Sequence, residues 1–144
     1  MAEAYLFDAS ALVDLVLGLG PPSVGIDVVF DGYLLDLTPY EAGNALWKIR
    51  FANDAITDRD LDDALDVLER LDREVSFEDA AGSELRPTMA MARKTGCTFY
   101  DASYLMVADR EDLTLVSEDG PQRNAAQDAG VSVRTLSDLA NDHG

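Results

Sequence analysis

"YLFDASALVDL", residues 5–15, passes from a short apolar run directly into Asp8, with Ser10 two positions later. An apolar run that leads into a helical pattern is typical of a strand followed by a helix in an α/β protein. Asp8 then stands at the carboxyl end of a strand, which is where open α/β sheets bind their ligands. The alternative role is structural, since an aspartate at this position also caps the helix that follows it.

Short apolar segments and helical patterns alternate along the rest of the chain. We expect strands at 4–7, 33–37, 113–116 and 131–134, with a weaker one at 75–77. We expect helices at 9–17, 39–52, 61–71, 79–95, 101–110 and 121–129, and a loop rich in glycine and proline at 17–25. This alternation predicts an α/β fold in which helices cover both faces of a parallel sheet, with residues 1–144 forming a single domain.

The amino-acid composition excludes several kinds of site. Cys97 is the only cysteine and His143 the only histidine, so we expect no internal disulfide, no cysteine metal cluster and no Ser-His or Cys-His nucleophile pair. The N-terminus lacks the pattern of a signal peptide, and no apolar run is long enough to cross a membrane. We therefore expect a cytoplasmic protein with no membrane partner.

The net charge of −17 is large for 144 residues. Aspartate outnumbers glutamate 20 to 8, and arginine outnumbers lysine 9 to 2. Such an excess of one charge repels itself in dilute buffer, whereas concentrated salt screens it, because the Debye length falls to about 3 Å at 1 M salt. We therefore predict a protein from a halophilic archaeon, in which most of the acids form a solvated surface.

Four acids stand at predicted strand ends or helix starts, and each of them has a purely structural interpretation. Asp8 and Asp101 can each cap a helix, and Asp119 can begin a turn. The segment TPYE at 38–41 matches a capping box in which Glu41 bonds back to the start of its helix.

Taken together, the four acids predict a metal site. The carboxyl ends of parallel strands share one edge of a sheet, so residues that follow them converge there. Converging carboxylates repel one another unless a cation offsets their charge or one of them stays protonated. A ligand set of oxygens without sulfur or imidazole suits Mg²⁺ or Mn²⁺. One or two such ions can hold a phosphodiester and activate water for attack on phosphorus.

Four segments carry a resemblance to a known family. They are FDAS at 7–10, YEAGNALW at 40–47, YDASYLMVA at 100–108 and LVSED at 115–119. In this order and at this spacing they resemble the PIN-domain family, in particular its VapC-type ribonuclease toxins. The resemblance implies a three-layer α/β/α sandwich with a central parallel sheet. It implies an acidic site for Mg²⁺ or Mn²⁺ and nearby supporting residues: Asp8, Glu41, Asp101 and Asp119 as ligands, and Ser10, Asn44 and Ser117 around them.

The same resemblance implies a function and partners. VapC-type proteins cut RNA with Mg²⁺ or Mn²⁺, often as homodimers, and a small antitoxin protein holds them inactive. The chain departs from the family pattern at 18–32, which is short and glycine-rich where a fuller helix is usual, and in its strongly negative charge. Trp47 and Tyr104 are candidates for base stacking, although the apolar helical runs around them favour a place in the core or a dimer interface.

Three other functions also fit parts of the sequence. A catalytically idle PIN-fold module in RNA processing needs no acidic site, so the intact acids argue against it. A structural domain that binds a metal but no substrate needs the same acids. A phosphatase of the haloacid-dehalogenase type also has an aspartate after its first strand. It usually has a second aspartate where this chain has Ser10, and no matching lysine is evident.

Overall fold

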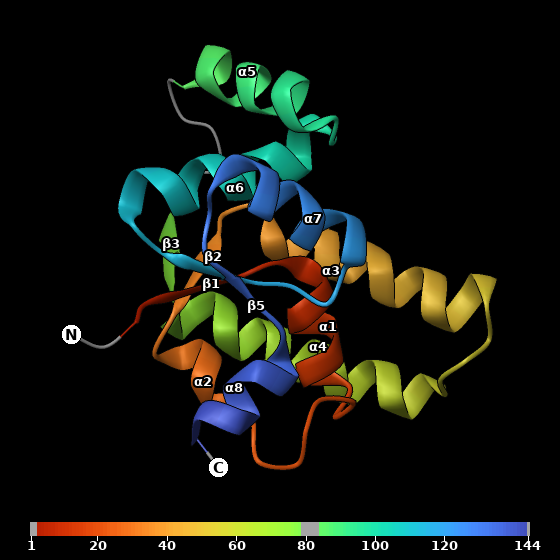
Figure 1. Ribbon diagram of the computed structural model, residues 1–144. Coiled ribbons are helices and arrows are strands. Elements are labelled where there is room, and N and C mark those ends of the chain that lie inside the picture. Colours follow the sequence, from red (N-terminus) through yellow and green to blue (C-terminus); the bar gives the residue numbers. More distant parts are fainter. Residues whose placement is uncertain (1–2, 79–83, 144) are drawn as a thin grey trace.

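A sheet of five parallel strands forms the centre of the computed structural model, which describes residues 3–78 and 84–143 (Figure 1). The strands are β1 (Tyr5–Phe7), β2 (Tyr33–Leu35), β3 (Ser76–Glu78), β4 (Thr114–Val116) and β5 (Val133–Arg134). Each of them overlaps a range expected from the sequence, and every pairing between neighbours is parallel. The predicted parallel sheet is therefore confirmed.

The order of the strands creates a crevice beside β1. Across the sheet the order is β3-β2-β1-β4-β5, so the chain builds outward from β1 on one side and then returns to its other side. Leu6 of β1 lies opposite Tyr33 of β2 and Leu115 of β4. In open α/β sheets such a reversal leaves a ligand-binding crevice outside the carboxyl ends of the strands. Asp8 follows β1 and Ser117 follows β4, so both stand at this point.

Helices cover both faces of the sheet, because successive strand residues point to opposite sides. Phe7 packs into a core with side chains of the helices on one face, and Leu6 packs into a second core on the other. The first face carries α1 (Ala9–Val16), α2 (Asp27–Phe30), α3 (Thr38–Trp47), α4 (Asp58–Glu74) and α8 (Leu136–His143). The second face carries α6 (Phe99–Glu111) and α7 (Gly120–Ala129), with α5 (Leu85–Thr95) packed outside α6. This arrangement confirms the three-layer α/β/α sandwich.

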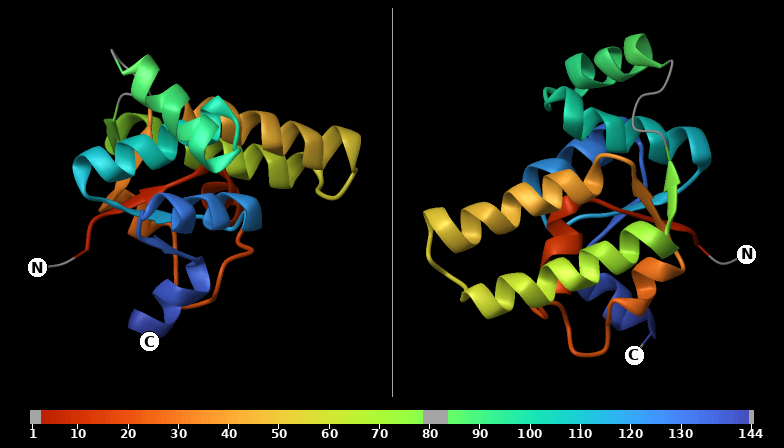
Figure 2. Two further views of the ribbon diagram at one scale, coloured as in Figure 1. Left: turned by 45° about the horizontal axis from the view of Figure 1, so that its top comes forward. Right: turned by 180° about the vertical axis from the view of Figure 1, so that it is seen from behind.

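A helical arm, residues 38–74, extends beyond the sheet (Figure 2). It consists of α3, a π-helical continuation η1 (Lys48–Ala52), a short turn and the antiparallel α4. The helix α4 begins with a capping box, in which Thr57 accepts from the Asp60 N–H and Asp60 accepts from the Thr57 N–H. Its acids face solvent while Ala64, Leu68 and Leu71 are buried, which is the amphipathic pattern expected from the sequence, although Leu65 is 37% exposed.

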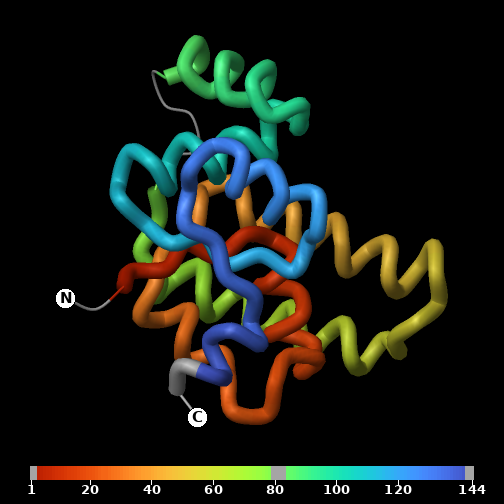
Figure 3. The backbone as a smooth tube through the Cα atoms, viewed as in Figure 1, coloured from red at the N-terminus to blue at the C-terminus, as the bar shows by residue number. Residues whose placement is uncertain are grey.

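Two helices were not expected from the sequence. They are α2, which has four residues, and α8, which packs Leu136 and Leu139 into the first core. The expected loop at 17–25 is confirmed, and it runs beside α8 (Figure 3). The helix expected at 79–95 begins at Leu85, and residues 79–83 lie outside the described part. Among the described helices, none is both long enough and apolar enough to cross a membrane.

Candidate active site

Four carboxylates from four segments meet at one cavity beside the carboxyl edge of the sheet. Asp8 follows β1, Glu41 lies in the first turn of α3, Asp101 lies in the first turn of α6, and Asp119 precedes α7. The cavity has a volume of about 170 Å³ and is lined by Asp8, Ala9, Ser10, Glu41, Asp101, Tyr104 and Asp119. The structure therefore brings together the four acids that the sequence placed at one edge.

Asp8 both caps a helix and lines the cavity, so its two interpretations are compatible. Its Oδ1 accepts hydrogen bonds from the Ala11 N–H at 3.0 Å and from Ser10 Oγ at 2.6 Å. The residue is only 5% exposed. Burial raises the pKa of the Asp8 carboxyl, hydrogen bonds from Ser10, Ser117 and Ala11 lower it in part, and the negative charge of Asp119 raises it again. Burial therefore disfavours the ionised form of Asp8, and the hydrogen bonds from its neighbours offset this only in part.

Two serine hydroxyls tie the end of β1 to the end of β4. Ser10 Oγ accepts from the Glu118 N–H at 2.9 Å while it donates to Asp8. Ser117 Oγ accepts from the Asp119 N–H at 3.1 Å and lies 3.4 Å from Ser10 Oγ. The hydroxyls of Ser10 and Ser117 thus hold Asp8 and Asp119 in position relative to each other.

The predicted capping box at the start of α3 is wrong. The N-cap of α3 is Leu37, which makes no side-chain hydrogen bond. Thr38 Oγ1 instead accepts from the Leu35 N–H at 3.2 Å and lies 2.7 Å from Tyr104 Oη. Glu41 Oε1 accepts from Tyr104 Oη at 2.6 Å. The Glu41 carboxylate therefore bonds to Tyr104 of α6 and not to the start of its own helix, and it lines the cavity.

Glu41 and Tyr104 share a buried environment that shifts both of their pKa values upward. Burial raises the pKa of Glu41, the hydrogen bond from Tyr104 lowers it in part, and the charges of Asp101 and Asp8 raise it further. Burial also raises the pKa of Tyr104 well above its usual value, and the neighbouring charge of Glu41 adds to this. The phenol of Tyr104 therefore stays protonated and remains a hydrogen-bond donor.

The other two acids differ in how they relate to their helices. Thr98 caps α6, since its Oγ1 accepts from the Asp101 N–H at 3.1 Å, so the predicted capping role of Asp101 is wrong. Burial raises the pKa of Asp101, a side-chain bond to Thr98 lowers it, and the charge of Asp119 raises it. Asp119 caps α7, where its Oδ2 accepts from the Gln122 N–H at 3.1 Å. The expected turn at Asp119 is thus the first turn of a helix.

The remaining candidates lie around the cavity or away from it. Asn44 lies exposed on α3, one turn after Glu41, and is not among the lining residues. Trp47 is 54% exposed on the same helix, whereas Tyr104 is 2% exposed and belongs to the second core. The expectation of a core position is thus confirmed for Tyr104 alone.

The four carboxylates of the cavity form no ion pair within the described part of the chain. No lysine or arginine within residues 3–78 and 84–143 forms an ion pair with any of the four carboxylates. In the same residues, no three Asp, Glu, His or Cys side chains are grouped closely enough to hold a metal ion. The donor set nevertheless suits Mg²⁺ or Mn²⁺ chemically, because it consists of carboxylate oxygens without sulfur or imidazole.

Comparison with known proteins gives the family of the chain. No family model matches it. Exonuclease VapC9 of Pyrobaculum aerophilum is 38% identical over 139 residues, which cover 94% of this chain and 95% of that protein. The chain belongs to the VapC family. This membership confirms the VapC-type resemblance of the sequence and speaks against a phosphatase of the haloacid-dehalogenase type.

Two solved structures support the fold of this VapC-family protein. The crystal structure of PAE2754 from Pyrobaculum aerophilum has a TM-score of 0.75 and 31% identity, and the match covers 99% of this chain and 97% of that one. The crystal structure of FitAcB from Neisseria gonorrhoeae has a TM-score of 0.55 and 15% identity, with 92% and 98% covered. The second likeness bears on the fold alone.

Proposed function

We propose that this VapC-family protein is a ribonuclease that depends on Mg²⁺ or Mn²⁺ and acts as the toxin of a toxin–antitoxin pair. One observation carries the proposal: four carboxylates from separate segments line one cavity without a basic partner among the described residues. The relative that is 38% identical is named an exonuclease, which supports nuclease chemistry. An idle module or a purely structural metal domain would leave RNA uncut.

The electrostatics of the cavity call for a cation. The pKa values of Asp8, Glu41 and Asp101 are raised by burial first and by neighbouring carboxylates second. The negative charges of neighbouring carboxylates repel one another, and a divalent cation bound between them would offset this repulsion. We propose that Asp8, Glu41, Asp101 and Asp119 hold one or two such ions. A bound ion would offset negative charge on a phosphodiester and make water more acidic.

Hydrogen bonds from the protein prepare these carboxylates as ligands. Ser10 and the Ala11 N–H fix Asp8 Oδ1, and Tyr104 fixes Glu41 Oε1. Partners of this kind orient metal ligands and raise affinity without touching the ion. We propose that Ser10 and Ser117 support the site in this way, and that Asn44 meets the substrate from the exposed side of α3.

The proposed chemistry is tested by cutting RNA in molar KCl with Mn²⁺, with EDTA, and with Asp101→Asn as the control for contaminating nuclease. Linear and circular RNAs of one sequence separate the two modes of cleavage, because a circle has no end from which an exonuclease can start. We expect endonucleolytic cutting, so the circle is opened. Degradation of the linear RNA alone would favour the second candidate, an exonuclease, to which the name of the 38% identical relative points. Cutting that survives in Asp101→Asn or in EDTA would contradict the proposed site.

The proposed partners follow from the family. We propose that the protein forms a homodimer in the cytoplasm, that RNA is its substrate, and that a small antitoxin protein blocks it. Light scattering in molar KCl measures the mass of the free protein, and a monomer would contradict the dimer. Co-expression with the product of a neighbouring small reading frame should give a stable complex that no longer cuts RNA.

A further inference from the structure

A chain of hydrogen bonds leads from the backbone of β2 to one carboxylate of the cavity. The Leu35 N–H lies 3.2 Å from Thr38 Oγ1, Thr38 Oγ1 lies 2.7 Å from Tyr104 Oη, and Tyr104 Oη lies 2.6 Å from Glu41 Oε1. Thr38 is fully buried and Tyr104 is 2% exposed. Buried hydroxyls need partners, and here each hydroxyl has two.

The donors and acceptors permit one direction along this chain. An ionised carboxylate only accepts, so the single proton of Tyr104 goes to Glu41. Tyr104 Oη must then accept from Thr38, whose own oxygen accepts from the Leu35 N–H. The chain therefore begins at a fixed backbone group and ends with the donor that faces Glu41.

The two helices that carry this chain also carry the acids. Thr38 and Glu41 share the first turn of α3, while Asp101 and Tyr104 are three residues apart on α6 and both line the cavity. Residues three apart on a helix lie on the same face. The hydroxyl that holds one carboxylate therefore comes from the helix that supplies another, which fixes α3 and α6 relative to each other at the site.

We infer that Tyr104 is a positioning residue, whose hydroxyl, oriented by Thr38, holds the Glu41 carboxylate in place for the bound cation. This inference rests on the proposed function, because it assigns Glu41 to the cation. Tyr104 does not touch the ion itself. Its hydroxyl fixes Oε1 and so determines how the rest of the Glu41 carboxylate faces the cavity.

The test is the affinity of the full chain for Mn²⁺, measured by calorimetry in molar KCl. The variant Tyr104→Phe keeps the ring and removes only the hydroxyl, and we expect a loss of affinity of about 10- to 100-fold, the usual effect of losing a hydrogen bond to a metal ligand. The matched control is Tyr33→Phe, at a partly buried tyrosine of β2 outside the cavity, which should bind Mn²⁺ like the wild type. Thermal unfolding without Mn²⁺ checks that each variant is folded.

A second series of variants changes Thr38, which precedes Tyr104 in the chain of hydrogen bonds. Thr38→Val removes the hydroxyl that orients Tyr104 and should lower Mn²⁺ affinity in the same direction, whereas Thr38→Ser keeps a hydroxyl and should restore it. A purely structural role of these residues would lower the unfolding temperature and leave the affinity of the folded protein unchanged. This series decides the question even if Tyr104→Phe does not fold.

The same titrations on Asp8→Asn and Asp101→Asn separate the two proposals. If both variants lose Mn²⁺ binding while Tyr104→Phe and Thr38→Val keep the wild-type affinity, the positioning role is overturned and the cation site stands. If Asp8→Asn and Asp101→Asn bind Mn²⁺ like the wild type, the cation site itself is wrong and the role of Tyr104 is wrong with it.

Discussion

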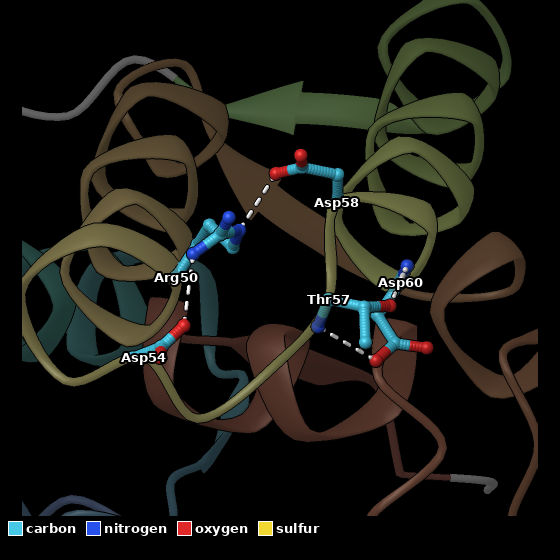
Figure 4. A network of polar contacts seen from close by, with 5 residues as sticks. All are labelled: Arg50, Asp54, Thr57, Asp58 and Asp60. Atoms are coloured by element: carbon cyan, nitrogen blue, oxygen red, sulfur yellow. Dashed lines mark hydrogen bonds and ion pairs between the residues drawn. The ribbon is translucent and has the colours of Figure 1, made fainter.

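The protein gathers acids in two places, at the cavity and at the tip of the helical arm, and the two differ in what faces the carboxylates. At the arm tip, Arg50 donates from Nε to Asp58 Oδ1 at 2.6 Å and from Nη1 to Asp54 Oδ1 at 3.0 Å (Figure 4). At the cavity, the described partners of Asp8 are two serine hydroxyls and a backbone N–H. Arg50 forms ion pairs in the first cluster, whereas no lysine or arginine of the described residues forms an ion pair with a carboxylate of the second.

The carboxylates of the two clusters also differ in how deeply they are buried. The side chains of Asp54 and Asp58 are 86% and 76% exposed, so water stabilises their charge, whereas Asp8 is almost fully buried. The pKa of Asp60 at the arm tip is lowered by hydrogen bonds with Thr57, while the pKa of Asp8 is raised by burial. An acidic cluster that is buried and unbalanced indicates a ligand-binding site, and one that is exposed and paired indicates a solvated surface.

The largest expected effect is on RNA cleavage. Asp101→Asn should lower the rate at least about 100-fold, because even the loss of a hydrogen bond around a metal ligand costs about 10- to 100-fold. Asp58→Asn makes the same chemical change at the arm tip and should leave the rate unchanged. Initial rates on one RNA with Mn²⁺ compare the two variants, and equal losses in both would remove the distinction between the clusters.

The next effect is on stability with and without Mn²⁺. At a Mn²⁺ concentration 100 times its dissociation constant, the free energy of unfolding should rise by about 2.7 kcal/mol. Asp8→Asn should fold, because asparagine caps helices as well as aspartate does, but it should lose this rise. Asp54→Asn at the arm tip should keep it. Urea unfolding at fixed KCl measures all three proteins, and a full response to Mn²⁺ in Asp8→Asn would argue against the site.

The sequence predicted the sheet and the location of the acids for the same physical reason. The three inner strands β1, β2 and β4 are short and mainly apolar segments, and polar residues that follow parallel strands meet at one edge. Asp8 and Asp119 were therefore found from local pattern alone. The helix α8 could also have been predicted from the sequence, because Thr135 and Asp138 form a capping box just before Leu139.

Other features depend on contacts that local sequence does not contain. The segment at 38–41 fits a capping box, but the Glu41 carboxylate bonds instead to the Tyr104 hydroxyl, 63 residues further along the chain. The role of Tyr104 was missed for the same reason, and its only local sign is its place one turn after Asp101 on the same face. The four-residue helix α2 is too short for a helical period to appear.

A third effect concerns pH in the absence of a divalent cation. The folded pKa values of Asp8, Glu41 and Asp101 lie above the unfolded values of 3.8 and 4.5. The folded protein therefore binds more protons than the unfolded chain in this window, and the free energy of unfolding should fall as pH rises from about 4 through the raised values. Asp60, with its lowered pKa, acts in the opposite sense, since its contribution is lost as pH falls.

The control for this pH effect is Asp8→Asn, which removes one of the three cavity carboxyls whose pKa is raised. Urea unfolding in EDTA at fixed KCl, from pH 4 to 8, should show a shallower fall in this variant than in the wild type. Identical slopes would mean that the buried carboxylate does not carry the effect.

A fourth effect concerns salt and comes from the surface as a whole. With a net charge of −17, the unfolding temperature should rise as KCl increases from 0.1 to 2 M, because salt screens the repulsion among the solvated acids. NaCl should act in the same direction. An unfolding temperature that does not change with salt would count against adaptation to a salty cytoplasm.

The smallest expected effect is at the arm tip itself. Arg50→Gln removes the guanidinium that pairs with Asp54 and Asp58, but these carboxylates are well solvated. The unfolding temperature should fall slightly in 0.1 M KCl and should match the wild type in 2 M KCl. A large loss at both salt concentrations would show that the arm tip depends on its charge balance as much as the cavity does.

The most direct test of the difference between the two clusters is anomalous scattering from crystals grown or soaked with Mn²⁺, at a concentration that supports RNA cleavage. We expect a strong manganese peak in the cavity between Asp8, Glu41, Asp101 and Asp119, and none at Asp54 or Asp58. Manganese at the arm tip and none in the cavity would contradict the proposed cation site.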